Sequence, residues 1–508
     1  MGFVSNLKIK ANSLFEYILI NHRWVIVVFF LLPLSFIYDI YYNTRSWLIF
    51  KLSSAPKNHD KKVAYVQNQV RKWNKGSKTN PMCTARPGWQ TISFRVPAYK
   101  STFNKIKINL VDILEIDTRK QTVRCEPLVT MGQLTKVLVD LGWTIPIVPE
   151  MDDLTVGGLV MGTGIETSSH KYGLFQHICT AFELVLADGS LITCNKDEHA
   201  DLFYSVPWSY GTLGFLTAVE IKIMPAQRFV KLNYIPCYSQ ESMISTFLSE
   251  SRKESENDYV EGIMFTYNAG VVMTGNMCNS VEEGKLNEIG KWYKPWFFKH
   301  VESYLKSGRG VEYIPIRDYY HRHTRSIFWE LQDIIPFGNN LLFRLLLGWL
   351  VPPKVSFLKR TQGQKVKELY ENNHFIQDML VPADQLKQAL DVFEKEVKIY
   401  PMWLCPFKLP ADPGMLRPLD GKCSLFVDIG TYGVPKVDNF HPVETTRRVE
   451  KFVRSAKGFQ MLYADTYMTV HEFREMFNHT LYDKIRKELQ CTKAFPEVYD
   501  KICRKARI

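Results

Sequence analysis

Hydrophobic residues gather in one long segment near the N-terminus and in many shorter runs after it. Residues 24–42 read WVIVVFFLLPLSFIYDIYY, in which Asp39 is the only charged side chain. As a helix this segment is about 28 Å long, which matches the hydrocarbon core of a bilayer. We therefore predict a transmembrane helix over 24–44, between an N-terminal segment over 1–23 and a linker over 45–57.

A cleaved signal peptide and a buried helix of a soluble protein are the alternatives for this segment. Its end, Asp39-Ile40-Tyr41-Tyr42, has no small-residue cleavage site, which disfavours the signal peptide. The buried helix stays open, although the run is long and apolar on all sides. An excess of basic residues after the segment favours a body on the cytoplasmic side. They are Lys8, Lys10 and Arg23 before it, and Arg45, Lys51, Lys57, Lys61 and Lys62 after it.

The shorter runs predict a mixed α+β protein. Apolar runs at 259–266 and 424–429 are typical of strands, the second because its residues alternate. Runs at 383–398 and 443–455 have the pattern of helices. This mixture predicts a sheet that is covered by helices.

A hairpin and a change of amino-acid composition indicate two domains. Residues 181–192 read AFELVLADGSLI, and the central Asp-Gly predicts a β-hairpin. After Pro225 the glycine-rich loops stop, and aromatic and basic residues become more frequent. We expect a first domain over 58–226 and a second, substrate-binding domain over 227–508.

Two further apolar stretches are too short to span a bilayer. Residues 292–298 read WYKPWFF, and residues 341–351 read LLFRLLLGWLV. Each stretch either touches the lipid headgroup layer, lines a substrate tunnel or belongs to the ordinary core.

Residues 155–173, TVGGLVMGTGIETSSHKYG, hold five glycines among serines and threonines. Glycine allows positive φ and a close approach of the backbone to a ligand, and successive N–H groups suit phosphate oxygens. Neither the G-x-G-x-x-G fingerprint nor a P-loop is present. The pattern predicts a loop that binds a pyrophosphate, with glycines needed only for turns as the alternative.

Composition and charge narrow the class of protein. The chain has 508 residues, of which 46% are hydrophobic and 23% charged, so it is long enough for several globular domains. The net charge of +12 is scattered, and no nucleic-acid-binding motif accompanies it, so we expect no nucleic-acid partner. Ten cysteines lie apart without a C-x-x-C pair, which argues against a metal site and a disulfide framework and fits a cytosolic body.

The order of glycine loop, Asp-Gly hairpin and YGTLGFLT (210–217) resembles the FAD-binding domain of the vanillyl-alcohol oxidase, or PCMH-type, flavoproteins. The resemblance implies that the glycine loop holds the FAD pyrophosphate and that the later glycines run beside the cofactor. Residues 83–89, CTARPGW, match the place of the first phosphate loop. They carry Arg86 and no histidine, which implies non-covalent FAD. The implied cofactor-binding residues are Thr155, Val156, Gly157, Gly158, Leu159, Val160, Met161, Gly162, Thr163, Gly164, Ile165, Glu166, Thr167, Gly211, Gly214 and Leu216.

Longer blocks at 149–190, 293–306, 319–340 and 458–468 are similar to the Δ24-sterol reductase family. The resemblance covers nearly the whole chain. It implies a membrane-anchored, FAD-dependent oxidoreductase that reduces the C24–C25 double bond of sterol side chains with NADPH, as in the conversion of desmosterol to cholesterol. It further implies a single-pass protein of the endoplasmic reticulum membrane, or of the Golgi membrane, that faces the cytosol and has other sterol-synthesis enzymes as possible partners.

An isolated alkene has no carbonyl to polarise it, so its reduction needs an acid that protonates C24. Two clusters contain candidate acids, 319–325 (YYHRHTR) and 463–467 (YADTY), and we favour Tyr463 and His323. If 319–325 is a strand, His321 and His323 share one face. Arg322 and Arg325 are candidates for an NADPH phosphate. The alternative is a polar network between the domains.

Two other functions stay open from the sequence. A flavin oxidase or dehydrogenase of the same fold would oxidise an alcohol with oxygen as the acceptor. A non-enzymatic sterol-binding scaffold would bind sterol without flavin, although it would have no need of an intact glycine loop.

Overall fold

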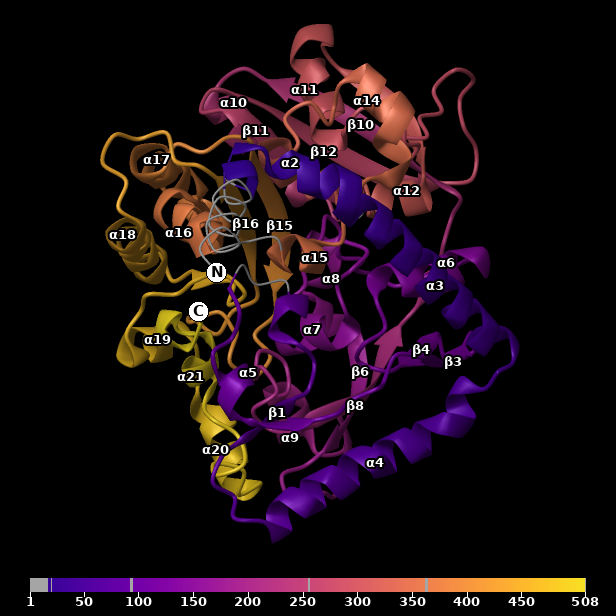
Figure 1. Cartoon of the computed structure of the whole chain (residues 1–508). Helices are drawn as coiled ribbons and strands as arrows, with labels where there is room; N and C mark the ends of the chain where they lie inside the picture. Colours follow the sequence, from indigo (N-terminus) through magenta and orange to yellow (C-terminus); the bar gives the residue numbers. More distant parts are fainter. Residues whose placement is uncertain (1–16, 20, 92–94, 255, 361–363, 508) are drawn as a thin grey trace, which may run out of the picture.

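The computed structural model describes residues 17–19, 21–91, 95–254, 256–360 and 364–507. Most of the predicted N-terminal segment, including Lys8 and Lys10, therefore lies outside the described residues. Within the described ranges the chain forms two large antiparallel sheets, and the N-terminal helix runs across the body (Figure 1). This mixed architecture confirms the predicted α+β class.

The first sheet has the strand order β3-β4-β8-β6-β7 in the part of the chain that the structure describes. Strands β6 (Cys179–Val185) and β7 (Leu191–Asn195) form the predicted hairpin. Its turn contains Asp188, whose carboxylate accepts a bond of 2.8 Å from the Ser190 N–H, and Gly189 at φ +86°. The other elements here are β1 (Met82–Thr84), α5 (Tyr99–Thr102), β2 (Asn104–Ile106), β3 (Ile113–Asp117), β4 (Thr122–Cys125), α6 (Met131–Asp140), β5 (Trp143–Thr144), α8 (Ser169–Tyr172), α9 (Ala200–Ser205), β8 (Phe215–Lys222) and β9 (Met224–Pro225).

The glycine-rich segment begins with a short helix, α7 (Val156–Met161), where the sequence suggested only a loop. Thr155 caps this helix because its side chain accepts a bond from the Gly158 N–H. Among the five glycines of the segment, only Gly173 has a positive φ, at +80°. A Cβ on Gly157 would lie 2.6 Å from the Pro127 Cβ, so close packing explains this glycine better than a special φ.

The second sheet has the order β13-β10-β12-β11-β15-β16-β14-β17 among the described residues. It contains the predicted strands as β11 (Tyr259–Thr266) and β16 (Ser424–Gly433), and the predicted helices as α17 (Leu386–Glu396) and α18 (Pro442–Ser455), which confirms all four. The remaining elements are β10 (Phe229–Cys237), α10 (Gln240–Ser251), β12 (Ala269–Cys278), α11 (Phe297–Ser307), β13 (Gly310–Pro315), α12 (Ile316–Tyr320), α13 (Glu330–Ile334), α14 (Leu341–Leu347), α15 (Val355–Arg360), α16 (Gln364–Asn373), β14 (Phe375–Pro382), β15 (Met402–Leu409) and β17 (Phe459–Gln460).

The chain passes from the first sheet to the second between β9 and β10, close to residue 226. Its C-terminal helices then return to the first sheet's side, where α20 (Thr480–Glu488) packs against α9. The Tyr482 hydroxyl lies 2.6 Å from the Thr212 hydroxyl, and Arg486 donates to the Thr212 carbonyl at 2.8 Å. The last helices are α19 (Val470–Met476), α20 (Thr480–Glu488) and α21 (Val498–Ile502). The division of the chain at residue 226 stays a prediction.

The apolar N-terminal segment forms one continuous helix, Arg23–Lys51, of 29 residues. It comprises α2 (Arg23–Ile26), a π-helical turn (Val27–Leu31) and α3 (Leu32–Lys51). With a mean hydropathy of 2.0 over its most apolar window, it is long and apolar enough to cross a membrane. This finding fits a membrane anchor.

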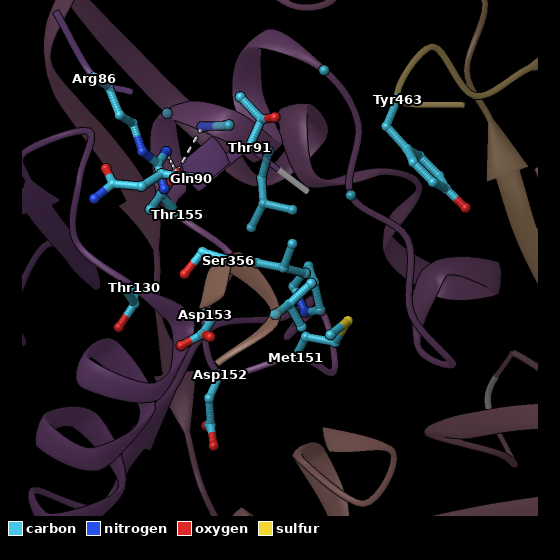
Figure 2. A pocket seen from close by; sticks show the side chains of 18 of the residues that line it. Arg86, Gln90, Thr91, Thr130, Met151, Asp152, Asp153, Thr155, Ser356 and Tyr463 are labelled. Atoms are coloured by element: carbon cyan, nitrogen blue, oxygen red, sulfur yellow. Dashed lines mark hydrogen bonds between the residues drawn. The ribbon is translucent and has the colours of Figure 1, made fainter. Parts of the chain in front are cut away.

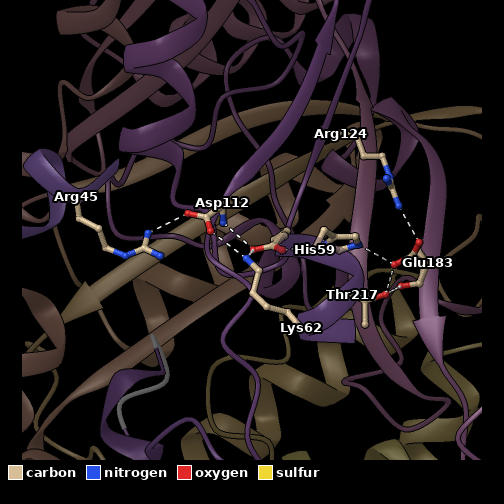
Figure 3. Close-up of polar contacts among 8 residues, drawn as sticks. Arg45, His59, Lys62, Asp112, Arg124, Glu183 and Thr217 are labelled. Carbon is tan, nitrogen blue, oxygen red and sulfur yellow. Dashed lines mark hydrogen bonds and ion pairs between the residues drawn. The ribbon is translucent and has the colours of Figure 1, made fainter. Parts of the chain in front are cut away.

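Polar side chains tie the N-terminal helix and α4 (Ala55–Lys75) to the first sheet (Figure 3). Arg45 and Lys62 both donate to the Asp112 carboxylate, each at 2.9 Å. His59 lies between two carboxylates, 2.8 Å from Glu126 and 3.1 Å from Glu183. Burial lowers the pKa of His59, but hydrogen bonds with these two carboxylates outweigh burial and raise this pKa to about 8. The network therefore holds a charged histidine near neutral pH.

Candidate active site

A cavity of about 880 Å³ lies between the two sheets. Residues from the glycine-rich segment, from strands β14 to β16 and from the N-terminal helix line it. Its size suits a cofactor together with a second molecule, because ligand pockets commonly measure about 300–1,000 Å³.

We call the first side of the cavity the glycine-loop wall. Its residues that line the cavity are Thr155, Gly157, Gly158, Leu159, Met161, Gly162, Thr163, Gly164, Ile165, Gly211, Gly214 and Leu216, all of them predicted from the sequence. Four predicted residues do not line it. Val156 and Val160 are buried core residues, Glu166 pairs with Arg322 at 2.8 Å, and the Thr167 hydroxyl lies 3.1 Å from that of Tyr319.

The glycine-loop wall fits a flavin cofactor. The hydroxyl of Thr163 is buried, and it has no hydrogen-bond partner in the described part of the chain. A Cβ on Gly162 would lie 3.0 Å from the Gly158 carbonyl oxygen, so this position needs glycine. The wall thus has a free hydroxyl and a bare backbone, which is what a phosphate-bearing ligand requires.

Buried cations stand beside this wall. Figure 2 shows Arg86 next to Thr155, whose hydroxyl accepts from the guanidinium at 3.4 Å. Burial, with Arg86 and Arg507 nearby, lowers the pKa of Lys359 to about 7. Burial, with Lys100 nearby, also lowers the pKa of Lys501 to about 7. Among the described residues, Arg86 donates to a hydroxyl and Lys359 and Lys501 donate to backbone carbonyls, and none of the three has a carboxylate partner. An anionic pyrophosphate would supply the missing negative charge.

We call the opposite side the sheet wall. It consists of Ile376, Asp378, Trp403, Asp428, Tyr432 and Tyr463, which all line the cavity. Asp378 on β14 stands opposite Gly430 on β16. Since side chains alternate along a strand, Asp428 and Tyr432 point to the same face as Gly430. A Cβ on Gly430 would lie 2.5 Å from the Tyr432 hydroxyl, so this glycine makes room for the polar group.

Two carboxyl groups on the sheet wall are held in unusual surroundings. Tyr432 donates to one oxygen of Asp378 at 2.5 Å, and Tyr463 donates to the other at 2.6 Å. Burial nevertheless raises the pKa of Asp378 to about 6. Asp428 is fully buried, and neither of its carboxyl oxygens has a hydrogen-bond partner in the ranges that the structure describes. Burial and the nearby Asp378 raise the pKa of Asp428 well above its usual range.

The structure separates the two acids that we favoured from the sequence. Tyr463 lines the cavity and lies across it from Arg86 and Thr155 (Figure 2). His323 does not line the cavity. It is fully buried, with Nε2 3.1 Å from a Glu261 oxygen and its ring stacked on that of Phe328. The expected strand over 319–325 is wrong, because the segment forms α12 and a 3₁₀ turn, and His321 and His323 have different partners.

The arginines suggested for an NADPH phosphate already have partners. Arg322 donates to Glu261 and Glu166, each at 2.8 Å, and also to the Tyr319 carbonyl. Arg325 donates to four backbone carbonyls between residues 289 and 294. These bonds leave neither guanidinium free for a phosphate, so the suggestion is not supported.

Sequence reasoning missed the carboxyl pair and the part that the N-terminal helix takes in the cavity. Asp428 is a charged residue on a strand that is otherwise apolar (SLFVDIG), and this contrast was a usable signal. Asp378 gave no such signal, because its position depends on the pairing of β14 with β16. Tyr38, Asp39 and Tyr42 of the N-terminal helix also line the cavity.

Comparisons with known proteins agree with this geometry. Residues 96–195 match the family model of the FAD binding domain. Delta(24)-sterol reductases of Macaca fascicularis and Homo sapiens are each 60% identical to the chain, over 97% of its length and 95% of theirs. The enzyme of that name from Pisum sativum is 40% identical, over 99% of the chain and 94% of its own length. The chain belongs to the Δ24-sterol reductase family.

Membership of the Δ24-sterol reductase family confirms the recognition that the sequence blocks suggested. The matched FAD-binding domain contains the first part of the glycine-loop wall, residues 155–165, and FAD is the cofactor of this oxidoreductase. The glycine-loop wall and its cations are the residues that would hold FAD.

Proposed function

We propose that this protein reduces the C24–C25 double bond of a sterol side chain, converting a desmosterol-type sterol into a cholesterol-type product with FAD and NADPH. The identity to Delta(24)-sterol reductases over nearly the whole chain supports this function. The observation that carries it is a cavity with a flavin-type loop on one side and protonatable carboxyls on the other.

The reaction adds one proton and one electron pair with its hydrogen across the double bond. Proton addition at C24 leaves positive charge at the tertiary C25, which is the more stable position. Bound FAD would supply the electron pair and second hydrogen to C25, having taken them from NADPH. The protein must therefore hold a proton near C24 and keep water away from C25, since water would trap the cation as an alcohol.

We propose that the sheet wall holds this proton. Two carboxyls in one dry site resist ionising together, so Asp378 and Asp428 share at least one proton near neutral pH. When Asp378 is protonated, it can donate to the Tyr463 oxygen while the Tyr463 hydroxyl donates to C24. The π electrons form the new C24–H bond, and solvent later restores the proton to the pair. His323 lies behind the wall, and we propose no catalytic part for it.

The remaining lining suits a sterol side chain and a developing cation. Ile327, Phe328, Ile376 and Met461 supply apolar surface. Trp403 lines the cavity beside them, and its indole N–H donates to Glu261 at 2.9 Å, which fixes the ring. A fixed aromatic face attracts positive charge and offers water no hydrogen bond.

We propose that FAD is bound without a covalent bond. No histidine lines the described cavity, and Cys83 is the one cysteine there. Burial raises the pKa of the Cys83 thiol, so it is not the nucleophilic thiolate. Acid precipitation should release the yellow chromophore, whereas flavin retained in the pellet would refute this.

We propose that the protein works on the endoplasmic reticulum membrane, or on that of the Golgi, with its body toward the cytosol. Cytosolic NADPH and the free cysteines support this side. The bilayer would supply sterol, and other sterol-synthesis enzymes would be its neighbours.

One anaerobic experiment tests the function. The protein is purified in detergent with its flavin, NADPH is added until the visible absorbance bleaches, and desmosterol is then supplied. We expect the absorbance to return and one cholesterol to form per flavin. Absorbance that returns only with oxygen, together with oxidation of an alcohol, would favour the oxidase. A protein without flavin that binds sterol unchanged would favour the scaffold.

A further inference from the structure

The N-terminal helix contacts the body of the protein along nearly its whole length. Near its start, Arg23 donates to the Leu358 carbonyl at 2.8 Å, and near its end Arg45 donates to Asp112 at 2.9 Å. Between them, the Ser35 hydroxyl accepts from the Lys354 N–H at 2.9 Å. Tyr42 donates to Gln133 at 2.8 Å.

These contacts conflict with a helix that crosses the bilayer. Arg23 and Arg45 are about 33 Å apart along a helix, which is the thickness of the hydrocarbon core. A spanning helix with these partners would take Asp112, Gln133 and Lys354 into lipid, together with the strands and loops that carry them. Burying such groups in hydrocarbon is strongly unfavourable.

The helix has two distinct faces. Buried positions recur every three or four residues at Val28, Leu31, Leu32 and Ser35, and this face meets the body. The opposite face has large exposed apolar side chains at a similar spacing. They are Phe30, Leu34, Ile37, Tyr41 and Leu48, each between 46% and 66% exposed. A helix with one packed and one bare apolar face is suited to lie on its side in a leaflet.

Helix α14 extends the bare surface. Leu342 and Leu346 are each 69% exposed. The Trp349 ring, directly after α14, contacts that of Phe36 with centroids 5.2 Å apart. Two segments that are distant in the sequence thus present adjoining apolar surfaces. Neither has a protein partner over this surface in the described residues, and a lipid leaflet is the partner that matches it.

The packed face also forms part of the cavity. Tyr38, Asp39 and Tyr42 line it. Lys354 pairs with Asp39 at 2.7 Å and with Asp153 at 2.6 Å, so it links the helix to the loop before the glycine-loop wall. The membrane-facing helix is therefore also a wall of the site.

We propose that the N-terminal helix lies in the plane of a single leaflet and forms one wall of the substrate cavity, so that a lipid-dissolved substrate enters from that leaflet. This placement differs from the single span that length alone predicts. That the substrate is a sterol rests on the proposed function, but the placement of the helix does not.

Labelling in sealed microsomes tests the placement without any need for turnover. An impermeant maleimide of high mass is applied to an Asn21→Cys variant, and exposed native Cys423 reports the side of the body. Both positions should label under the same condition, with or without detergent, because an in-plane helix keeps its start on the body's side. If one of these two cysteines labels in intact microsomes while the other labels only after detergent is added, the proposal is overturned.

Cross-linking tests the contact itself in intact membranes. A short bifunctional thiol reagent should join the Phe36→Cys and Trp349→Cys pair. The matched pair Phe30→Cys and Trp349→Cys, with Phe30 on the bare face, should not be joined. Failure of the first pair, or equal yields from both, would contradict an in-plane helix that packs against the body.

A kinetic comparison tests the part of the helix in the cavity. Asp39→Asn should raise KM for sterol several-fold and keep the flavin, because it removes the charge that pairs with Lys354. The control Asp60→Asn changes an exposed carboxylate on α4 and should leave KM unchanged. Equal KM values for the two variants would overturn the role of the helix as a wall. If the wild type does not turn over sterol at all, the proposed function is refuted. The labelling result would still support the placement of the helix.

Discussion

The two walls of the cavity present different chemical groups to a ligand. The glycine-loop wall presents bare backbone and a free Thr163 hydroxyl, with cations nearby that lack carboxylate partners. The sheet wall presents two buried carboxyls whose pKa values are raised. The first wall acts through clearance and through positive charge, which is fixed on Arg86 and which Lys359 and Lys501 gain fully when an anion binds. The second acts through a proton that it can hold and release. Changes to the first should therefore remove the cofactor, and changes to the second should remove the chemistry.

The largest effect should come from closing the glycine-loop wall. In Gly158→Val the new Cβ would have only the Thr155 hydroxyl within 4 Å, at 3.1 Å, so the fold should tolerate it. The branched side chain would enter the cavity, and we expect loss of flavin and of measurable activity. Flavin absorbance per protein measures this, with Gly76→Ala as the control on a surface turn.

Gly164→Val is a second change to the glycine-loop wall. Its Cβ would lie 2.8 Å from that of Phe175, so this variant should disturb folding as well as flavin binding. Normal flavin content in Gly158→Val would contradict the role given to the glycine-loop wall.

Changes to the sheet wall should leave the flavin in place. Tyr463→Phe and Asp428→Asn should each lower kcat by about 10²–10⁴, the usual range for general acid catalysis. KM for sterol should change little, because the groups act in the chemical step. Steady-state kinetics with flavin-replete protein measure both values.

His323→Gln is the matched comparison for Tyr463→Phe, because His323 is buried behind the wall. Its main effect should be a lower free energy of unfolding, with a smaller loss of kcat. A larger loss of kcat in His323→Gln than in Tyr463→Phe would reverse our assignment.

The pH dependence of kcat should reveal the carboxyl pair. Burial raises the pKa of Asp378 to about 6, and its protonated form is the one that donates. Activity should therefore be highest below pH 6 and fall by up to about tenfold per unit above it. Asp378→Asn should remove this falling limb. A wild-type kcat that is constant from pH 5 to pH 8 would argue against the relay.

The smallest effect concerns the scaffold of the glycine-loop wall. The pKa of His59 is raised to about 8 from 6.5, which corresponds to about 2 kcal/mol of folding free energy. Because the folded pKa is the higher one, this stability is complete below pH 6.5 and is lost as the pH rises through 8. Thermal unfolding of the wild type should show this loss, and His59→Gln should lack it. Equal pH profiles would contradict the charged histidine.

The two walls also differ in how far the sequence predicts them. Twelve lining residues of the glycine-loop wall were predicted, because eleven of them lie within 155–165 and 211–214 and have a local signature. The sheet wall draws on 376–463, and only strand pairing brings Asp378 to Asp428. Tyr463 was predicted from chemistry, but no local pattern could show that His323 faces Glu261 instead of the cavity.

The N-terminal helix, too, is predicted only in part from the sequence. Its apolar length predicts a membrane anchor, and the observed helix fits one, because length and hydropathy are local properties. Its contacts with Gln133, Asp112 and Lys354 depend on the tertiary fold, so no reading of 24–44 alone could reveal them.

The isotopic pattern of a single turnover in deuterium oxide shows which hydrogen comes from the protein and which comes from the flavin. Enzyme is reduced with NADPH in ordinary water and then mixed rapidly and anaerobically with desmosterol in deuterium oxide, so that the single turnover is complete before the flavin N–H exchanges. We expect cholesterol with deuterium at C24 and ordinary hydrogen at C25, and a rate that falls sharply in Tyr463→Phe. Deuterium at C25, or no sterol product from flavin-replete enzyme, would contradict this expectation.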